Sequence, residues 1–408
     1  MTPTHVPDSE AAPGIGTAEA AEIAAAVASR LPPPLAALFN ASFIRSHALY
    51  DEFVYRLALR VVREAGLEAP LGERGSVETM VAQAGLDARR AVVPVGWLLR
   101  HLAARRVLEQ EGDGAGFRAR DRVPVLDPAP VFEAQRGHDP SWLPSYVLAE
   151  TVARDYPAFL RGETAGEEVL FSPRRFPLWL DYFSNDNGLY AVNNRVGAVA
   201  VEAWMPRGAA TILELGGGLA SGAVAVLERL EDTGRLHELH AYRFTELVPA
   251  FLRRGERVLA SRFPDAPFLG FERLDMNRPF AEQGIAPGSL SLVYAVNTLH
   301  VAHDLEFTLG EALRALEPGG RLVVSECVRP RAGQTIYAEF VFNLMETFRS
   351  PRLHPVYRPN GGFLTPEQWT LAMEAAGFAD VRLLPDIVGL RDRFPTFAVA
   401  AIGAVRPA

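Results

Sequence analysis

The spacing of hydrophobic residues divides the chain into two regions with different periodicities. From about residue 43 to residue 123, apolar residues recur every three or four positions, as in FVYRLALRVVREAGL, which predicts amphipathic helices. After about Asn194, short apolar runs alternate with helical stretches. Such alternation indicates a mainly parallel sheet that is covered on both faces. We therefore expect an α/β domain preceded by a helical domain.

Seven runs in the second region have the length and composition of buried strands. Each is short, and at least half of its residues are apolar. They lie at residues 211–215, 238–245, 267–274, 290–296, 321–328, 380–384 and 396–402. We predict a disordered lead and short helix over residues 1–34, a helical domain with an aromatic linker over 35–185, and the α/β domain over 186–408.

The predicted helical domain contains a winged-helix pattern. Ser76 can cap one helix, a second helix follows Gly85, and RVLEQEGDGAGFRAR reads as two strands around a Gly-Asp-Gly turn. The second helix is dominated by Val, Trp and Leu, and mainly Arg89, Arg90 and Arg100 are left for phosphates. This composition favours a role in dimerisation or substrate capping over DNA binding.

Composition and charge argue against several classes of protein. The net charge of −8 disfavours a general nucleic-acid or anionic-membrane surface. Cys327 is the single cysteine, so the chain has no internal disulfide. The N-terminus lacks the basic and apolar regions of a signal peptide, and no stretch is apolar for long enough to span a bilayer. We therefore expect a cytoplasmic protein.

A glycine-rich turn follows the first predicted strand, in TILELGGGLASG. Glycine has no Cβ, so a strand, a glycine turn and a helix let the backbone approach a nucleotide-like ligand. Ser221 stands where a dinucleotide fingerprint would have its third glycine, which disfavours a dinucleotide.

Polar side chains stand at the ends of four successive predicted strands. They are Glu214, Glu246, Asp275 and Asn297. Ligands of open α/β sheets bind at the carboxyl ends of the strands. The first carboxylate can help to hold an amino group, the second can accept both hydroxyls of a ribose, and the third can accept the adenine amine. The series predicts a site for a conjugate of adenosine with an amino acid.

With these residues, the region from about Asn194 to Pro407 resembles the class I S-adenosylmethionine-dependent methyltransferases. The acidic-x-Gly-x-Gly-x-Gly motif of that family is matched from Glu214, with Ala220 in place of the third glycine. The resemblance implies a Rossmann-like core with a mainly parallel seven-stranded sheet, and S-adenosylmethionine as the cofactor. The cofactor-binding residues that it implies are Glu214, Gly216, Gly218, Glu246, Leu247, Asp275, Met276 and Asn297.

Two subfamilies are similar. The core, from YRFTELVPAFL through LVYAVNTLH, resembles the carbon-methylating domains of polyketide synthases. The winged-helix pattern followed by NTLHVAHD resembles two-domain small-molecule O-methyltransferases, which commonly dimerise through the N-terminal region. The resemblance implies a homodimer and a small biosynthetic acceptor, either free or carrier-bound. The core favours carbon as the methylated atom, whereas the domain layout favours oxygen. The same fold also serves non-methylating catalysts and partner subunits.

Methyl transfer to a hydroxyl or an acidic carbon requires a base. His300 follows the fourth predicted strand and Glu326 ends the fifth, so neighbouring parallel strands would bring both to one rim. In both subfamilies the matching positions carry a His base and a Glu partner. We predict that His300 is the general base and that Glu326 orients it. His303, followed by Asp304, is the rival base, and no residue spacing is typical of a metal site.

Two segments are candidates for the wall of an acceptor pocket. A predicted helix over residues 336–349 could equally be core or pocket wall. Because the resembled enzymes have an insertion here that contacts the acceptor, we predict acceptor contacts from Tyr337, Phe342 and Met345. The aromatic residues between 124 and 185 either pack a helical linker or form the roof of the site.

Overall fold

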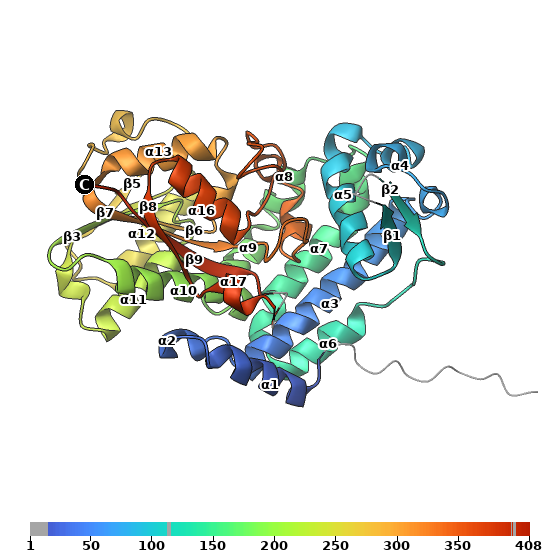
Figure 1. Ribbon diagram of the computed structural model, residues 1–408, viewed down its shortest axis with the longest axis horizontal. Helices are drawn as coiled ribbons and strands as arrows, with labels where there is room; N and C mark the ends of the chain where they lie inside the picture. Colours follow the sequence, from blue (N-terminus) through green and yellow to red (C-terminus); the bar gives the residue numbers. More distant parts are fainter. Residues whose placement is uncertain (1–14, 112–115, 393, 395–396) are drawn as a thin grey trace, which may run out of the picture.

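The computed structural model describes residues 15–111, 116–392, 394 and 397–408, and it consists of a helical N-terminal part beside an α/β part (Figure 1). The start of the predicted lead, the predicted Gly-Asp-Gly turn and residue 396 of the last predicted strand lie outside the described residues. In the α/β part, α13 and α16 lie on one side of the sheet and α10 and α11 on the other (Figure 1).

The N-terminal part is built from helices and one antiparallel pair of short strands. In chain order the elements are α1 (Thr17–Ala28), α2 (Pro33–Ala36), α3 (Ala41–Glu64), α4 (Val77–Gln83), α5 (Ala88–Ala104), β1 (Leu108–Glu111), β2 (Gly116–Ala119), α6 (Ala129–His138), α7 (Leu143–Leu160), α8 (Gly166–Phe171), α9 (Phe176–Tyr182) and α10 (Gly188–Trp204). Side-chain caps set several of the starts: Asn40, Ser76 and Asp87 each accept a hydrogen bond from a backbone N–H in the first turn of the following helix.

The apolar face of α5 packs inside the chain. Val95, Trp97, Leu98 and Leu99 are all buried. The indole nitrogen of Trp97 donates to Glu339 Oε2 at 2.8 Å, which ties α5 to the segment after the fifth strand of the sheet. The hydrophobic composition that disfavoured DNA binding is therefore used for packing within the chain.

The seven predicted strands form one sheet. They are β3 (Ala210–Leu215), β4 (Leu239–Thr245), β5 (Leu269–Glu272), β6 (Leu290–Val296), β7 (Leu316–Cys327), β8 (Ala379–Leu384) and β9 (Val399–Val405), in the order β5-β4-β3-β6-β7-β9-β8. The first five are parallel, and β9 is antiparallel to β7 and β8. The helices between them are α11 (Ser221–Asp232), α12 (Pro249–Arg262), α13 (Leu305–Ala315), α14 (Glu339–Phe342), α15 (Glu346–Arg349), α16 (Pro366–Ala375) and α17 (Ile387–Leu390). The prediction of a mainly parallel seven-stranded sheet is confirmed.

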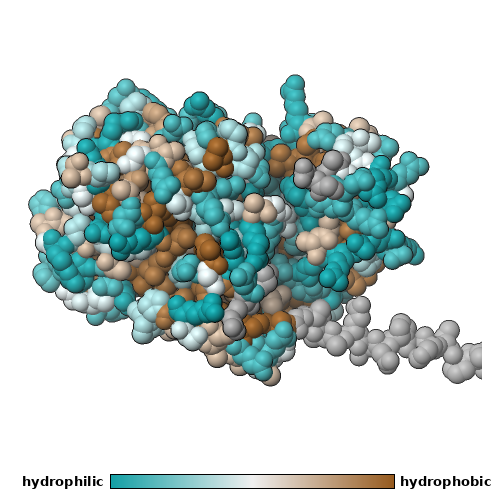
Figure 2. Space-filling view, in the orientation of Figure 1, coloured by the Kyte–Doolittle hydropathy of each residue, from teal (hydrophilic) through white to brown (hydrophobic). Residues whose placement is uncertain are grey.

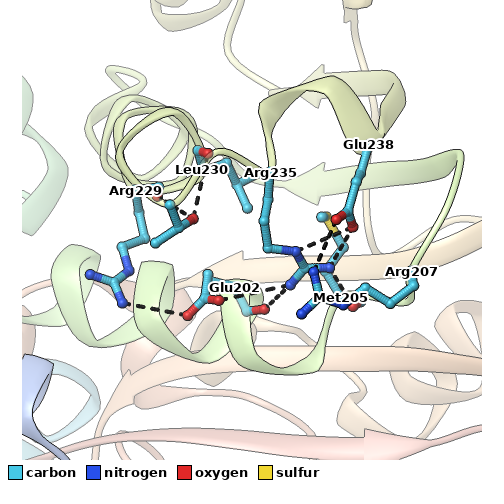
Figure 3. A network of polar contacts seen from close by, with 8 residues as sticks. Glu202, Met205, Arg207, Arg229, Leu230, Arg235 and Glu238 are labelled. Atoms are coloured by element: carbon cyan, nitrogen blue, oxygen red, sulfur yellow. Dashed lines mark hydrogen bonds and ion pairs between the residues drawn. The ribbon is translucent and has the colours of Figure 1, made fainter.

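A buried arginine braces the end of the sheet where β3 and β4 begin (Figure 3). Arg235 is 5% exposed and donates to the backbone carbonyls of Glu202 and Met205 at the end of α10. Its guanidinium also pairs with Glu238 at 2.7 Å, and Glu202 accepts from Arg229. Backbone oxygens and a carboxylate thus satisfy the charge of Arg235 and join α10 to the segment before β4.

The predicted helix over residues 336–349 is wrong, because the chain forms two short helices there. Between α14 and α15, the backbone carbonyl of Leu344 lies against Gly166 of α8, where a Cβ would stand only 1.8 Å from that oxygen. The Glu346 N–H donates to Glu167 Oε1 at 3.1 Å. This packing against α8, which is distant in sequence, interrupts the helix.

None of the helices over the described residues is both long enough and apolar enough to cross a membrane. On the face drawn in Figure 2, hydrophilic side chains predominate over α4, β1 and β2, and hydrophobic ones gather around β9 and α10.

Candidate active site

A cavity of about 410 Å³ lies at the carboxyl ends of β3, β4 and β6. The predicted site residues that line it are Glu214, Gly216, Gly218, Glu246, Leu247, Asp275, Met276, Asn297, His300, Tyr337, Phe342 and Met345. Of the predicted site residues, only Glu326 is not in the lining, because it lies fully buried behind His300. The structure therefore brings the predicted cofactor, catalytic and acceptor residues together in one place.

The predicted glycine turn lies between β3 and α11. Gly216 and Gly218 have φ angles of 61° and 55°, in the left-handed region that favours glycine. A Cβ on Gly216 would come within 2.5 Å of the Thr298 side chain. Ala220, in the position of the third glycine of the motif, also has a positive φ, of 70°, which costs an alanine about 1 kcal/mol. The turn keeps the glycine-type conformation despite the substitution.

Glu214 is a buried carboxyl group in the floor of the cavity. It is 1% exposed, and its Oε2 accepts a hydrogen bond from the Tyr242 hydroxyl at 3.0 Å. Desolvation raises the pKa of Glu214 to about 8, the Tyr242 hydrogen bond opposes this rise, and the nearby Glu246 adds to it. In the free protein at neutral pH, Glu214 is therefore mainly protonated, and a cation in the cavity would favour its ionised form.

Glu246 shapes the turn as well as lining the cavity. Its Oε2 accepts from the Gly218 N–H at 2.9 Å, and its Oε1 accepts from the Val248 N–H at 2.8 Å. Each carboxylate oxygen has a second lone pair, so the group can still accept hydrogen bonds from a ligand.

Two neighbouring asparagines of α10 line the cavity, and the sequence analysis missed both. Asn193 donates to Asn297 Oδ1 at 3.1 Å, and the same oxygen accepts from the Cys327 N–H at 3.0 Å, so Asn297 links β6, β7 and α10. Asn194 is fully buried, its Nδ2 donates to Asn185, and its Oδ1 has no hydrogen-bond partner among the described residues. A polar pair inside an apolar helix is the sequence signal that would have identified them.

His300 and Glu326 form a buried pair at the rim of the cavity. The Nδ1 of His300 lies 2.7 Å from Glu326 Oε2, and the side chain of Glu326 is fully buried. The other carboxylate oxygen accepts from the backbone N–H groups of Thr298, at 3.0 Å, and of His300, at 3.3 Å. A carboxylate on Nδ1 favours the tautomer in which that nitrogen carries the proton, which leaves Nε2 able to accept one.

A buried arginine holds the loop that carries His300. Arg358 is 1% exposed, and its guanidinium donates to the backbone carbonyl of His300 at 2.6 Å and to that of Ala302 at 2.7 Å. Burial lowers the pKa of Arg358 to about 10, and Asp304 and Glu326 oppose this effect. No pattern in the sequence distinguishes this arginine from others in polar segments, because its partners are backbone atoms more than fifty residues away.

His303 lies outside the site. Its side chain is exposed, it does not line the cavity, and its backbone N–H donates to Asn277 at 2.8 Å. Asp304 accepts from the Phe307 N–H as the cap of α13 and pairs with Arg352, so it does not orient His303. The geometry favours His300 over this rival.

Aromatic rings close the acceptor side of the cavity. Tyr182 and Phe183 line it together with Tyr337 and Phe342, and the Phe363 ring lies 4.5 Å from the His300 ring. Other aromatic residues of the 124–185 stretch are packed in the core: Trp142, Tyr146, Tyr156 and Trp179. Some aromatic residues of this stretch therefore pack the core, and others line the cavity.

Over the part of the chain that the structure describes, no group of three or more His, Cys, Asp or Glu side chains could hold a metal ion. The chemistry of the site is built from a histidine, carboxylates, amides and aromatic rings.

Comparison with known proteins relates the chain to polyketide synthases. No family model matches it. Highly reducing polyketide synthase 2 of Gibberella zeae is 28% identical over 293 residues, which cover 70% of this chain and 10% of the synthase. Polyketide synthase PksR of Bacillus subtilis is 28% identical over 249 residues, which cover 59% of this chain and 9% of the synthase. The chain thus corresponds to about a tenth of the length of these relatives.

Three solved structures with a similar fold are named as methyltransferases. The CurJ carbon methyltransferase has a TM-score of 0.75 at 21% identity, and the match covers 95% of this chain and 99% of CurJ. The DszA carbon methyltransferase has a TM-score of 0.69 at 23% identity and coverages of 96% and 94%. The trans-methyltransferase CalH, in complex with SAH, has a TM-score of 0.59 at 20% identity and coverages of 88% and 90%. The matches to CurJ and DszA cover nearly the whole chain, and its α/β part has the class I methyltransferase fold.

Proposed function

We propose that this chain is an S-adenosylmethionine-dependent methyltransferase that methylates an acidic carbon of a small acceptor in natural-product biosynthesis. The observation that carries the proposal is the buried pair of His300 and Glu326, on the same cavity as the carboxyl groups of Glu214 and Glu246. The shared fold with CurJ and DszA, which are named as carbon methyltransferases, supports carbon as the nucleophile.

The polar groups of the cavity fit the proposed cofactor. When bound, S-adenosylmethionine supplies an electrophilic methyl group on a positively charged sulfur. The unpartnered Oδ1 of Asn194 and the carboxyl of Glu214 would accept from its ammonium group, and Glu246 would accept from the ribose hydroxyls. Asp275, whose Oδ1 already accepts from the Asn277 N–H, would hold the adenine amine, with Leu247 and Met276 beside it.

In this proposal, His300 removes the proton of the acceptor carbon that the methyl group replaces. Its Nε2 takes the proton from the acceptor carbon, and the Glu326 carboxylate stabilises the imidazolium through Nδ1. The Phe348 and Phe363 rings pack against the imidazole and limit the access of water. Arg358 acts as a positioning residue, because it holds the backbone carbonyl of His300.

The acceptor is proposed to be carrier-bound, because the relatives of the chain are polyketide synthases. Residues 35–185 are proposed to cap the acceptor site and to contribute to a homodimer in the cytoplasm. The capping role is supported by the Trp97–Glu339 hydrogen bond, which fastens α5 to the segment that contributes Tyr337 to the cavity.

Calorimetric titration with S-adenosylmethionine and S-adenosylhomocysteine tests the proposal first. We expect micromolar binding that Glu246→Ala weakens by roughly ten- to a hundredfold, about 1.4 to 3 kcal/mol, because the ribose loses its acceptor. Glu246→Gln is the matched control, since an amide oxygen keeps one of the two backbone hydrogen bonds that hold the turn. Absence of binding to the wild-type chain would rule out the cofactor and the proposed function.

Cofactor binding should also release a proton. The pKa of Glu214 is about 8 in the free protein, so near pH 7 a bound ammonium should ionise the carboxyl and release up to one proton. Because the proton leaves on binding, affinity should rise with pH between about 6 and 8 and level off above the pKa. Titrations at pH 7 in buffers of different ionisation enthalpy measure the release, and Glu214→Gln should abolish it. An enthalpy that does not depend on the buffer would contradict this assignment.

A further inference from the structure

A second cavity, of about 640 Å³, lies between the N-terminal helices and the segment that follows β7. One side comes from α4, its N-cap Ser76, and α5, and the other from residues 329–361. It shares no lining residue with the methyl-transfer cavity, and the function proposed above does not use it.

One stretch of chain separates the two cavities. Tyr337 and Phe342 line the methyl-transfer cavity, whereas Thr335, Glu339 and Asn343 line the second one. The second cavity therefore lies on the other side of the acceptor wall and is a separate compartment.

Hydrogen-bond donors without partners line this second cavity. The guanidinium of Arg100 makes no hydrogen bond or ion pair with any described residue, and burial lowers its pKa although Glu339 raises it. Asn343 is 3% exposed, and its Nδ2 has no partner in the described chain. The Nε of Arg349 is likewise buried and unpartnered. The Nη1 of Arg349 does donate to the Arg89 carbonyl, at 3.4 Å. Two buried donor atoms, Asn343 Nδ2 and Arg349 Nε, are thus left without acceptors in the described chain, which is costly unless a ligand supplies them.

The residues that line the cavity include three arginines and two glutamates, so the lining has a small excess of positive charge. Arg329 is neutralised by Glu339 at 2.5 Å, so this pair contributes little net charge. Glu78, on α4, is exposed, and Arg100 and Arg349 are partly buried. Outside the lining, Glu167 and Glu346 offset part of the charge of Arg349. The site therefore favours an anion.

Apolar side chains make up another part of the lining. Trp97 and Val92 of α5 line it, together with Val93, Leu353 and Pro359. Val93 is 42% exposed and Leu353 is 55% exposed, although both are large hydrophobic side chains. The lining thus suits a ligand with an oxyanion at one end and an apolar body.

We propose that this second cavity binds a small organic phosphate, with the phosphate at Arg100, Asn343 and Arg349 and the apolar part against Trp97. A phosphate presents three terminal oxygens, one for each donor group, and it carries more negative charge than a carboxylate.

Calorimetric titration with phenyl phosphate tests this site on the whole chain without the methyl-transfer cofactor. We expect saturable binding that Arg100→Gln weakens by roughly tenfold or more, because the substitution removes the guanidinium that donates to the phosphate. Arg89→Gln is the matched control: it removes the same charge from an exposed position on the same helix and should bind like the wild type. Inorganic phosphate and benzoate should each bind more weakly than phenyl phosphate, because inorganic phosphate lacks the apolar ring and benzoate lacks the phosphate group.

Three results would overturn the proposal: no saturable binding of phenyl phosphate, equal weakening by Arg89→Gln, or benzoate binding as tightly as phenyl phosphate. If Arg100→Gln fails to fold, Asn343→Leu provides the second test and should also weaken binding. Because the titration contains no S-adenosylmethionine, failure here leaves the proposed methyltransferase function standing, and failure of that function leaves this site standing.

Discussion

Replacing His300 with glutamine is expected to lower the rate of methyl transfer by about 10³-fold, within the range that general-base catalysis contributes. Glutamine fills much of the same space beside the Phe363 ring, 4.5 Å away, but it cannot take a proton from the acceptor. Cofactor affinity should stay within roughly twofold of the wild type, because the proposed cofactor contacts lie on other residues. Single-turnover methyl transfer from labelled S-adenosylmethionine measures the rate, and calorimetry measures the affinity.

His303→Gln is the matched control for this experiment. It alters a histidine three residues away that is exposed and lies outside the cavity, so methyl transfer should be unchanged. A normal rate in His300→Gln would contradict the role of His300 as the base. A loss of activity in His303→Gln would instead point to His303 as the base.

Replacing Glu326 with glutamine should cost a similar factor, about 10³-fold, because it changes the tautomer of the base. The Oε1 of Glu326 accepts from two backbone N–H groups, of Thr298 and His300. A glutamine oxygen can keep those bonds only if its NH₂ group faces His300 Nδ1. Nδ1 would then have to accept a hydrogen bond, and the proton would move to Nε2, where the acceptor proton must be received.

The double variant His300→Gln/Glu326→Gln tests whether the two residues act as a unit. We expect its rate to be close to that of the His300 variant alone, because Glu326 acts only through the imidazole. Rate losses that multiply would show that Glu326 has a separate role. Thermal unfolding of each variant, measured in parallel, separates a catalytic loss from a loss of folded protein, which matters because Glu326 is fully buried.

The rule that ligands bind at the carboxyl ends of parallel strands predicted much of the candidate site. Glu214, Glu246, Asp275 and Asn297 are far apart in sequence, yet all four line one cavity. Parallel strands run in the same direction, so their carboxyl ends lie at one edge of the sheet. Polar residues at those ends therefore come close together. The same rule placed His300 beside Glu326, because β6 and β7 are parallel neighbours.

By itself, the sequence determined the α/β architecture, the glycine turn and the residues at the strand ends, because these depend on local periodicity and on one property of parallel sheets. Only the tertiary structure decided the break between α14 and α15, the clamp of Arg358 on the His300 loop and the second cavity beside Arg100. Each of these results from contacts between segments distant in the chain, or from backbone atoms that every residue carries. Such contacts leave no periodic signal in the sequence.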